Sequence, residues 1–375
     1  MHMLSGAAMV EDDVPILPGG DVIEPEGTRP EGPPASHLLS LPPELLVLAV
    51  SLVKGKAAPR LSCQGLRGCV DAGTTQLVWV GGPSLGVSLV AASLPALCQH
   101  IRLLDCSNMR SLDSLVGCPS SVQTLICSGT RVASLVPLSA CPRLQALDCT
   151  GTLVADLGPL ASCKQLRSLE CTGTAVSDLA PLGACTVLHT LCCYSTAVAD
   201  LGPLSACKAL HTLTCHHARV SDLGPLSACT VLQHLYCYST AVADLGPLSA
   251  CKALQTLYCG STAVSDLTPL AACTGLQTLY CSSTLVADLG PLAACTGLKT
   301  LFFSSTRVTD LSPLSACTGL QTLFFTQTGV AVLLPLAPCT GLVDLFCDAH
   351  VPRTQVTRLQ AACVKLRVRW GAGRL

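Results

Sequence analysis

Residues 144–165 read LQALDCTGTLVADLGPLASCKQ, and units of this length and pattern follow one another without insertion or deletion. The apolar residue that leads each unit recurs every 22 residues. The leading residues are Val122, Leu144, Leu166, Leu188, Leu210, Leu232, Leu254, Leu276, Leu298, Leu320 and Leu342. A strict period of this length indicates that each unit is one turn of a solenoid stacked on its neighbours. Such a stack presents an extended surface, which favours binding over catalysis.

Each unit opens with a short predicted strand. Leu144, Leu147 and Cys149 are spaced to point inward from that strand and from its exit. Strands one repeat apart should pair in parallel at about 4.8 Å. We therefore expect a curved parallel sheet, with one short strand every 22 residues from about Leu104 to Leu345.

A tight turn follows the strand. Asp156 can accept a hydrogen bond from the amide of Gly158, because the next residue, Pro159, has no N–H to offer. The same Asp-Leu-x-Pro-Leu turn recurs at Asp178, Asp200, Asp222, Asp244, Asp266, Asp288 and Asp310. A proline in every turn excludes a long α-helix on the outer side and favours a short 3₁₀ segment.

The repeat pattern, LxxLxCxxTxVxDLxPLxxCxx, resembles the short leucine-rich repeats of bacterial internalins and of the regulatory subunit that binds type 1 protein phosphatase. The resemblance covers residues 101–366. It implies an α/β solenoid, a horseshoe with a concave parallel β-sheet, convex 3₁₀ and turn segments, and a small helical N-terminal region. The chain departs from the family pattern in having Cys for Leu at two core sites and Thr for the usual Asn. Because Thr has one hydroxyl donor, the side-chain ladder between turns should be weaker.

Most of the 26 cysteines follow the repeat and form two files, each with one residue per turn at a fixed position. The first file is Cys127, Cys149, Cys171, Cys193, Cys215, Cys237, Cys259, Cys281 and Cys347. The second file is Cys141, Cys163, Cys185, Cys207, Cys229, Cys251, Cys273, Cys295, Cys317 and Cys339. Phe303 and Phe325 replace Cys in the first file, so the position is a space-filling one. We predict buried, unbridged thiols that act as small core hydrophobes, with no metal site because no CxxC pair accompanies them.

The chain divides into five stretches by composition. These are an acidic Pro/Gly-rich tail predicted to be disordered (1–37), a compact segment (38–80), irregular capping repeats (81–121), regular repeats (122–341) and a C-terminal repeat with a basic cap (342–375). The net charge of −1 gives no reason to expect nucleic acid or a membrane as partner. The absence of a signal peptide, a glycosylation sequon and disulfides predicts an intracellular protein, cytoplasmic or nuclear.

The compact segment carries a second resemblance. Residues 37–79, HLLSLPPELLVLAVSLVKGKAAPRLSCQGLRGCVDAGTTQLVW, resemble an F-box, the motif that docks on the Skp adaptor of cullin ubiquitin ligases. The resemblance implies that the adaptor is bound by Leu41, Pro42, Glu44, Leu45, Leu46, Leu48 and Leu52. Alternatively, the segment is only an N-terminal cap that covers the open edge of the solenoid.

The residues between the inward positions of each strand should face the concave surface, and those directly before the position of Cys149 form the central file. Along the chain these residues are Asp105, Ile126, Asp148, Glu170, Cys192, Thr214, Tyr236, Tyr258, Tyr280, Phe302, Phe324 and Phe346. Six consecutive aromatic residues in one file indicate a recognition surface for a protein target, whereas Asp148 and Glu170 would suit a basic segment of that target. Alternatively, the rings stack only to stabilise neighbouring strands.

Four histidines, His211, His216, His217 and His234, gather over two repeats, and we interpret them as polar surface residues. We find no phosphate loop, nucleophile elbow or paired catalytic carboxylates, so we expect neither an enzyme nor a cofactor. The sequence predicts the substrate-recruiting F-box subunit of an SCF-type ubiquitin ligase, with its target on the concave face. The alternative is a scaffold without a ubiquitin role, or a phosphatase-regulator-like binder, in which residues 38–80 are a cap.

Overall fold

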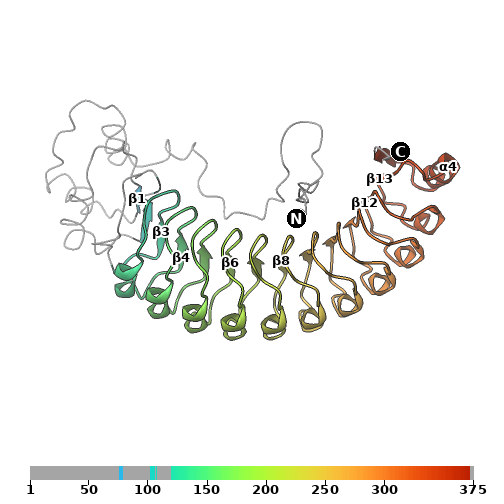
Figure 1. Ribbon diagram of the computed structural model, residues 1–375. Coiled ribbons are helices and arrows are strands. Elements are labelled where there is room, and N and C mark those ends of the chain that lie inside the picture. The colour runs from blue at the N-terminus through green and yellow to red at the C-terminus, as the bar shows by residue number, and fades with distance from the viewer. Residues whose placement is uncertain (1–75, 79–101, 106, 108–119, 372–375) are drawn as a thin grey trace, which may run out of the picture. The chain divides into compact units, whose positions relative to one another are not determined.

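The computed structural model describes residues 76–78, 102–105, 107 and 120–371. Within these ranges fourteen strands form one parallel sheet whose order follows the chain, as Figure 1 shows. The strands are β1 (Gln76–Val78), β2 (Leu103–Asp105), β3 (Thr124–Ile126), β4 (Ala146–Asp148), β5 (Ser168–Glu170), β6 (Thr190–Cys192), β7 (Thr212–Thr214), β8 (His234–Tyr236), β9 (Thr256–Tyr258), β10 (Thr278–Tyr280), β11 (Thr300–Phe302), β12 (Thr322–Phe325), β13 (Asp344–Asp348) and β14 (Arg367–Gly371). The predicted solenoid with a concave parallel sheet is confirmed.

The strand register follows the sequence period. In the regular repeats, each strand residue pairs with the residue one repeat later in the chain, as Leu147 pairs with Leu169. The irregular ends differ by one residue. Leu104 pairs with Leu125, which is one residue less than the period, and Leu345 pairs with Val368, which is one residue more. Identical positions of successive repeats therefore form straight files across the sheet.

Short 3₁₀ helices line the outer side of the arc (Figure 1). They are η2 (Val136–Ala140), η3 (Gly158–Ser162), η4 (Ala180–Ala184), η5 (Gly202–Ala206), η6 (Gly224–Ala228), η7 (Gly246–Ala250), η8 (Thr268–Ala272), η9 (Gly290–Ala294), η10 (Ser312–Ala316) and η11 (Leu334–Leu336). The amide of Gly158 donates to Asp156 Oδ1 at 2.7 Å, and the seven later aspartates make the same bond at 2.7 or 2.8 Å. This confirms the predicted hydrogen bond of the Asp-Leu-x-Pro-Leu turn, which precedes the eight 3₁₀ helices from η3 to η10.

The core lies between the sheet and the 3₁₀ helices, and both cysteine files are buried in it as free thiols. The second file also links successive turns. The thiol of Cys207 donates to the carbonyl oxygens of Leu182 at 3.4 Å and Cys185 at 3.6 Å, both in the preceding turn. The threonines in place of Asn act locally instead, since Thr152 Oγ1 donates to the Cys149 carbonyl of its own repeat at 2.6 Å. On the outer side, cysteine thiols thus make hydrogen bonds that link successive turns.

The last turn of the solenoid contains an α-helix, α4 (Arg353–Ala362), where earlier turns have a 3₁₀ segment. Pro352 is the N-cap, so no proline interrupts the helix, and Val356 and Leu359 are buried. Strand β14 follows the helix and pairs with β13. The repeat pattern did not predict this helix, because the stretched last turn reads in the sequence simply as a longer repeat.

Several predictions fall on residues that the structure does not describe. The tail (1–37), the F-box-like segment (38–80) apart from strand β1, and much of the stretch 81–121 lie outside the described residues. The seven proposed adaptor-binding residues between Leu41 and Leu52 are therefore outside it too. Strand β1 pairs with β2, so the last part of the 38–80 segment belongs to the sheet.

Candidate protein-binding face

Alternation along each strand decides which side chains face the concave surface. In β9, Leu257 is fully buried in the core, whereas Thr256 and Tyr258 are half-buried. The same pattern holds for every strand from β2 to β11. The central file named from the sequence thus lies on the concave face, on strands whose backbone is held on both sides by neighbours.

The six aromatic residues of this file form one continuous row, which we call the aromatic stack: Tyr236, Tyr258, Tyr280, Phe302, Phe324 and Phe346. Successive ring centroids lie 5.0, 5.6, 5.7, 4.6 and 5.3 Å apart. Four of the five ring pairs are stacked, with interplanar angles from 14° to 28°, and the Tyr280–Phe302 pair is tilted by 41°. All six residues are half-buried, so the rings cover one another while part of each meets solvent.

A second row of rings lies two residues further along the chain than the central file, just beyond the ends of strands β6, β7 and β8. The imidazole of His216 lies between the phenol rings of Tyr194 and Tyr238, at centroid distances of 4.2 and 4.1 Å. We call these three residues the His216 sandwich. The sequence carried a signal for it, since the three residues are spaced by one repeat and therefore fall in one file.

The two rows meet at Gly260. A Cβ atom at this residue would lie 2.2 Å from Cε1 of Tyr280, so only glycine leaves room for that ring. Gly260 occupies the next place in the file of the His216 sandwich, and Tyr280 leans over it from the aromatic stack. The absence of a side chain here joins the two rows into one aromatic surface.

Burial controls the protonation of these rings. It lowers the pKa of His216 to about 3, with a smaller contribution from His217, so His216 is neutral, and its Nδ1 is buried without a hydrogen-bond partner. It raises the pKa of Tyr258 to about 12, with Tyr236 and Tyr280 adding to the effect. At neutral pH His216 and Tyr258 therefore add no charge to the face, and the Tyr258 phenol is a hydrogen-bond donor.

The remaining histidines do not form a metal centre. His189 and His211 stack on each other at 5.1 Å, and each has its Nδ1 2.6 Å from a backbone carbonyl oxygen. No group of three or more His, Cys, Asp or Glu side chains in the described ranges could hold a metal ion. Nor does any helix in these ranges have the length and apolar character needed to cross a bilayer.

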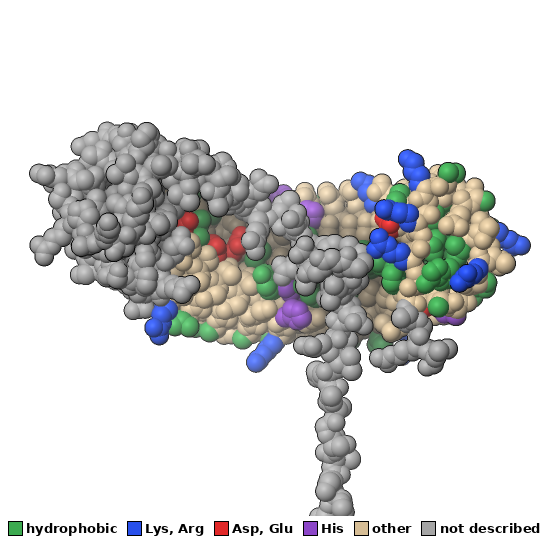
Figure 2. Space-filling model, turned by 90° about the horizontal axis from the view of Figure 1, so that it is seen from above, with side chains coloured by type: hydrophobic (Ala, Val, Ile, Leu, Met, Phe, Trp, Pro, Cys, Tyr) green, Lys and Arg blue, Asp and Glu red, His purple; other side chains and the backbone are tan. Residues whose placement is uncertain are grey.

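Acidic side chains occupy the N-terminal end of the face. Asp148 on β4 and Glu170 on β5 are half-buried neighbours in the central file, as predicted, and Asp148 Oδ1 accepts the amide of Thr150 at 3.0 Å. Their negative charge acts on the next residue of the file. Burial, together with Glu170 and Asp148, raises the pKa of Cys192 to about 11. In Figure 2 most of the acidic groups in view gather toward one end of this face, and most of the basic groups lie toward the other.

The basic end lies on β14, which the sequence analysis did not assign to the face. Arg369 pairs in register with Phe346 and so continues the central file beyond the aromatic stack. Next to it, Arg367 makes an ion pair with Asp344 at 3.1 Å. From the sequence these arginines were predicted to belong to a basic cap, because the longer last turn breaks the 22-residue period that gives the register of the earlier strands.

Comparisons with known proteins agree with this geometry. A family model described as Leucine Rich repeats (2 copies) matches residues 274–316. A comparison with curated proteins finds no match.

Several solved structures are similar. An internalin (inlF) from Listeria monocytogenes superposes with a TM-score of 0.72 and 21% identity over 90% of this chain and 99% of its own. A leucine-rich repeat protein of Leptospira interrogans gives a TM-score of 0.59 and 12% identity over 82% and 97% of the two chains. The functional domain of InlJ from Listeria monocytogenes, which includes a cysteine ladder, gives 0.51 and 19% over 76% and 64%. On its fold, the described part of this chain is a leucine-rich-repeat solenoid.

Proposed function

We propose that the chain binds another protein on its concave face, with the aromatic stack as the anchoring surface. The observation that carries the proposal is a comparison between repeats. In the central file the N-terminal repeats have Asp148, Glu170, Cys192 and Thr214, yet their strands pair in the same way as those that carry aromatic rings. The fold therefore does not require an aromatic residue at this position.

The core offers a contrast between two kinds of stacking. Phe303 and Phe325 stack at 5.3 Å and are fully buried, as expected of rings that serve stability. The rings of the aromatic stack remain partly in solvent although they are neighbours of this pair in the chain. A contiguous row of partly exposed rings on rigid strands favours binding, because little side-chain entropy remains to be lost.

The test is to replace Tyr258 and Tyr280 together by alanine. Loss of central aromatic anchors costs about 2 kcal/mol or more in typical interfaces, so capture of the target from cell extract should fall strongly. A matched control replaces Leu153 and Leu285, which are 59% and 45% exposed and lie off the strands, by alanine. If the tyrosine variant captures as much target as the wild-type chain, the rings stack for stability only. A large drop in the melting temperature of that variant without a loss of capture has the same meaning.

We further propose that residues 38–80 dock on a Skp-type adaptor, so that the chain recruits its target to an SCF-type ubiquitin ligase. The support is the F-box-like sequence. Leu45→Asp together with Leu46→Asp should abolish adaptor binding, because burial of each leucine contributes on the order of 2 kcal/mol. The measurement is a pull-down with the purified adaptor, with circular dichroism as the control for folding.

The alternative role for this segment, a cap on a scaffold or phosphatase-regulator-like binder, is favoured by strand β1, which pairs with β2 at the start of the sheet. A cap also predicts a different outcome for the same double variant. If the aspartates lower the melting temperature of the whole solenoid and the wild-type chain does not bind the adaptor, the segment acts as a cap.

A further inference from the structure

We propose that the partner lies along the concave face with a fixed polarity: an acidic, acceptor-rich segment along Phe302, Phe324 and Phe346 as far as Arg369, and a basic segment at Asp148 and Glu170. The proposal rests on the proposed function and adds the chemistry and the direction of the ligand. Three features of the face support it.

The first feature is that the aromatic stack presents ring edges. Phe324 is nearly parallel to Phe302 on one side, at 19°, and to Phe346 on the other, at 14°. With both faces covered by neighbours, the exposed part of such a ring is its edge. Because an aromatic ring has a positive edge and a negative face, the exposed edges favour oxygen acceptors. A partner cation or sugar that needs a ring face finds the faces occupied.

The second feature is the row of donors beside the rings. The phenols of Tyr236 and Tyr258 are protonated at neutral pH, and burial raises the pKa of each further above its usual value. A file of threonine hydroxyls runs along one side of the stack, at Thr256, Thr278, Thr300 and Thr322. Carbonyl and carboxylate oxygens of a partner can accept hydrogen bonds from both kinds of hydroxyl.

The third feature is that the acids near Arg369 are already engaged. Asp344 is paired with Arg367 at 3.1 Å. Asp348 is buried and accepts the amides of Gln327 and Thr328, at 2.7 and 3.1 Å. Arg369 is exposed at the end of the central file, and among the described residues no acidic side chain pairs with it. It is therefore positioned to meet a carboxylate of the partner.

The opposite end of the same file is negative, which sets the direction. Glu170 lies on β5 and Arg369 on β14, which are separated by nine steps of the sheet. At about 4.8 Å per step, this distance is roughly 43 Å. About 13 residues of extended chain span it. The ligand is thus a protein segment of that length with opposite charges at its two ends.

The experiment uses a phage library of random 16-residue peptides, selected on the full chain. We expect enriched peptides to carry acidic and basic blocks at opposite ends. Selection on Arg369→Glu should remove the acidic block, and selection on Asp148→Lys with Glu170→Lys should remove the basic block. Melting curves for every variant establish that each is folded.

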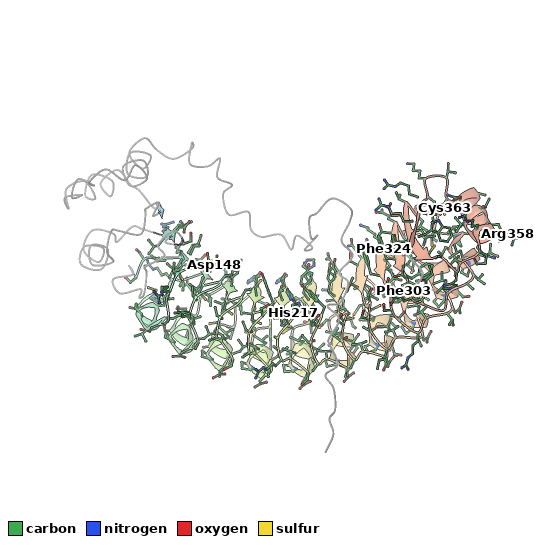
Figure 3. The ribbon with its side chains drawn as sticks, turned by 45° about the horizontal axis from the view of Figure 1, so that its top comes forward. Asp148, His217, Phe303, Phe324, Arg358 and Cys363 are labelled. Carbon is green, nitrogen blue, oxygen red and sulfur yellow. The ribbon has the colours of Figure 1, made fainter. Side chains whose placement is uncertain are left out.

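A matched charge control comes from α4. Arg358 lies on that helix at the outer rim of the last turn (Figure 3), and Arg358→Glu changes the net charge as Arg369→Glu does. The affinity of a selected peptide should fall about tenfold for Arg369→Glu and less than twofold for Arg358→Glu. Equal losses would overturn the proposal, because they would indicate only a general charge effect.

Other outcomes separate this proposal from the proposed function. Enriched peptides that need Tyr258 and Tyr280 but show no charge segregation overturn the polarity and leave concave binding in place. If the enriched peptides place arginine or tryptophan against the rings, the inference that the aromatic stack exposes ring edges is overturned. The proposal is also overturned if the wild-type chain enriches peptides no more than the Tyr258→Ala, Tyr280→Ala double variant does. It is likewise overturned if the chain forms a concentration-dependent dimer that covers the same rings. Either result also removes the basis of the proposal in the proposed function.

Discussion

The imidazole of His216 lies against the phenol of Tyr238, with ring centroids 4.1 Å apart and planes 12° apart. Tyr194 covers the opposite face at 4.2 Å. The arrangement places a polar ring where two aromatic neighbours exclude water, and the buried Nδ1 has no hydrogen-bond partner. A buried unpaired nitrogen of this kind reduces stability, so the stacking contacts must offset it.

The first prediction concerns the pH dependence of stability. Burial lowers the folded-state pKa of His216 from 6.5 to about 3, so the unfolded chain binds this proton first as the pH falls. The contribution of His216 to the free energy of unfolding is therefore largest above pH 6.5 and decreases as the pH falls from about 6.5 towards 3. His216→Phe keeps the stack and removes the titration, so its melting temperature should depend less on pH over that range. An unchanged slope between the two proteins would contradict this.

The second prediction compares two adjacent phenylalanines. Phe303 is fully buried and Phe302 is half-buried on the concave face. Phe303→Ala should lower the free energy of unfolding by about 3–5 kcal/mol, because it leaves a large cavity in the core. Phe302→Ala should cost roughly 0.5–1.5 kcal/mol for lost ring contacts. Denaturant unfolding measures both, and similar losses would mean that the concave rings are part of the core.

The third prediction concerns the residue at each strand exit that has a positive φ. The first regular repeats have glycine there, as at Gly151 with φ 64°, whereas later repeats have other residues, as at Ser261 with φ 51°. Ser261→Gly should therefore stabilise the chain, and Gly151→Ala should destabilise it by about 1 kcal/mol, since a Cβ disfavours this backbone region. Thermal melts should show opposite shifts, and shifts in the same direction would refute the argument.

The fourth prediction concerns thiol reactivity. Burial raises the pKa of Cys251 to about 12, and that of Cys192 to about 11 with the help of nearby carboxylates. Cys192 is half-buried on the concave face, whereas the other described cysteines are buried. Alkylation of the native chain at pH 8 should therefore modify Cys192 slowly and Cys251 only after unfolding. Peptide mapping by mass spectrometry measures both, and rapid labelling of Cys251 would show that the second file is accessible.

Much of the face could be predicted because each repeat position maps to one side of the strand. The position of Tyr258 in its unit was enough to place it beside Tyr236 and Tyr280, and the spacing of Asp156 and Pro159 was enough to predict the turn. His216 was interpreted from the sequence as a polar surface residue, whereas its ring is covered by Tyr194 and Tyr238 and its Nδ1 is buried, because a period places residues in one file without showing that their rings stack. Arg369 was missed because α4 lengthens the last turn and shifts the register by one residue.

The sequence by itself determined the solenoid, its parallel register and the burial of the cysteine files. These properties depend only on a period of 22 residues that repeats without interruption. The tertiary structure decided which part of each ring meets solvent, that Tyr280 leans over Gly260, and that Arg369 ends the file. Those features depend on ring orientation and on contacts between turns, and a periodic pattern assigns a side chain to a face without specifying its rotation or its neighbours.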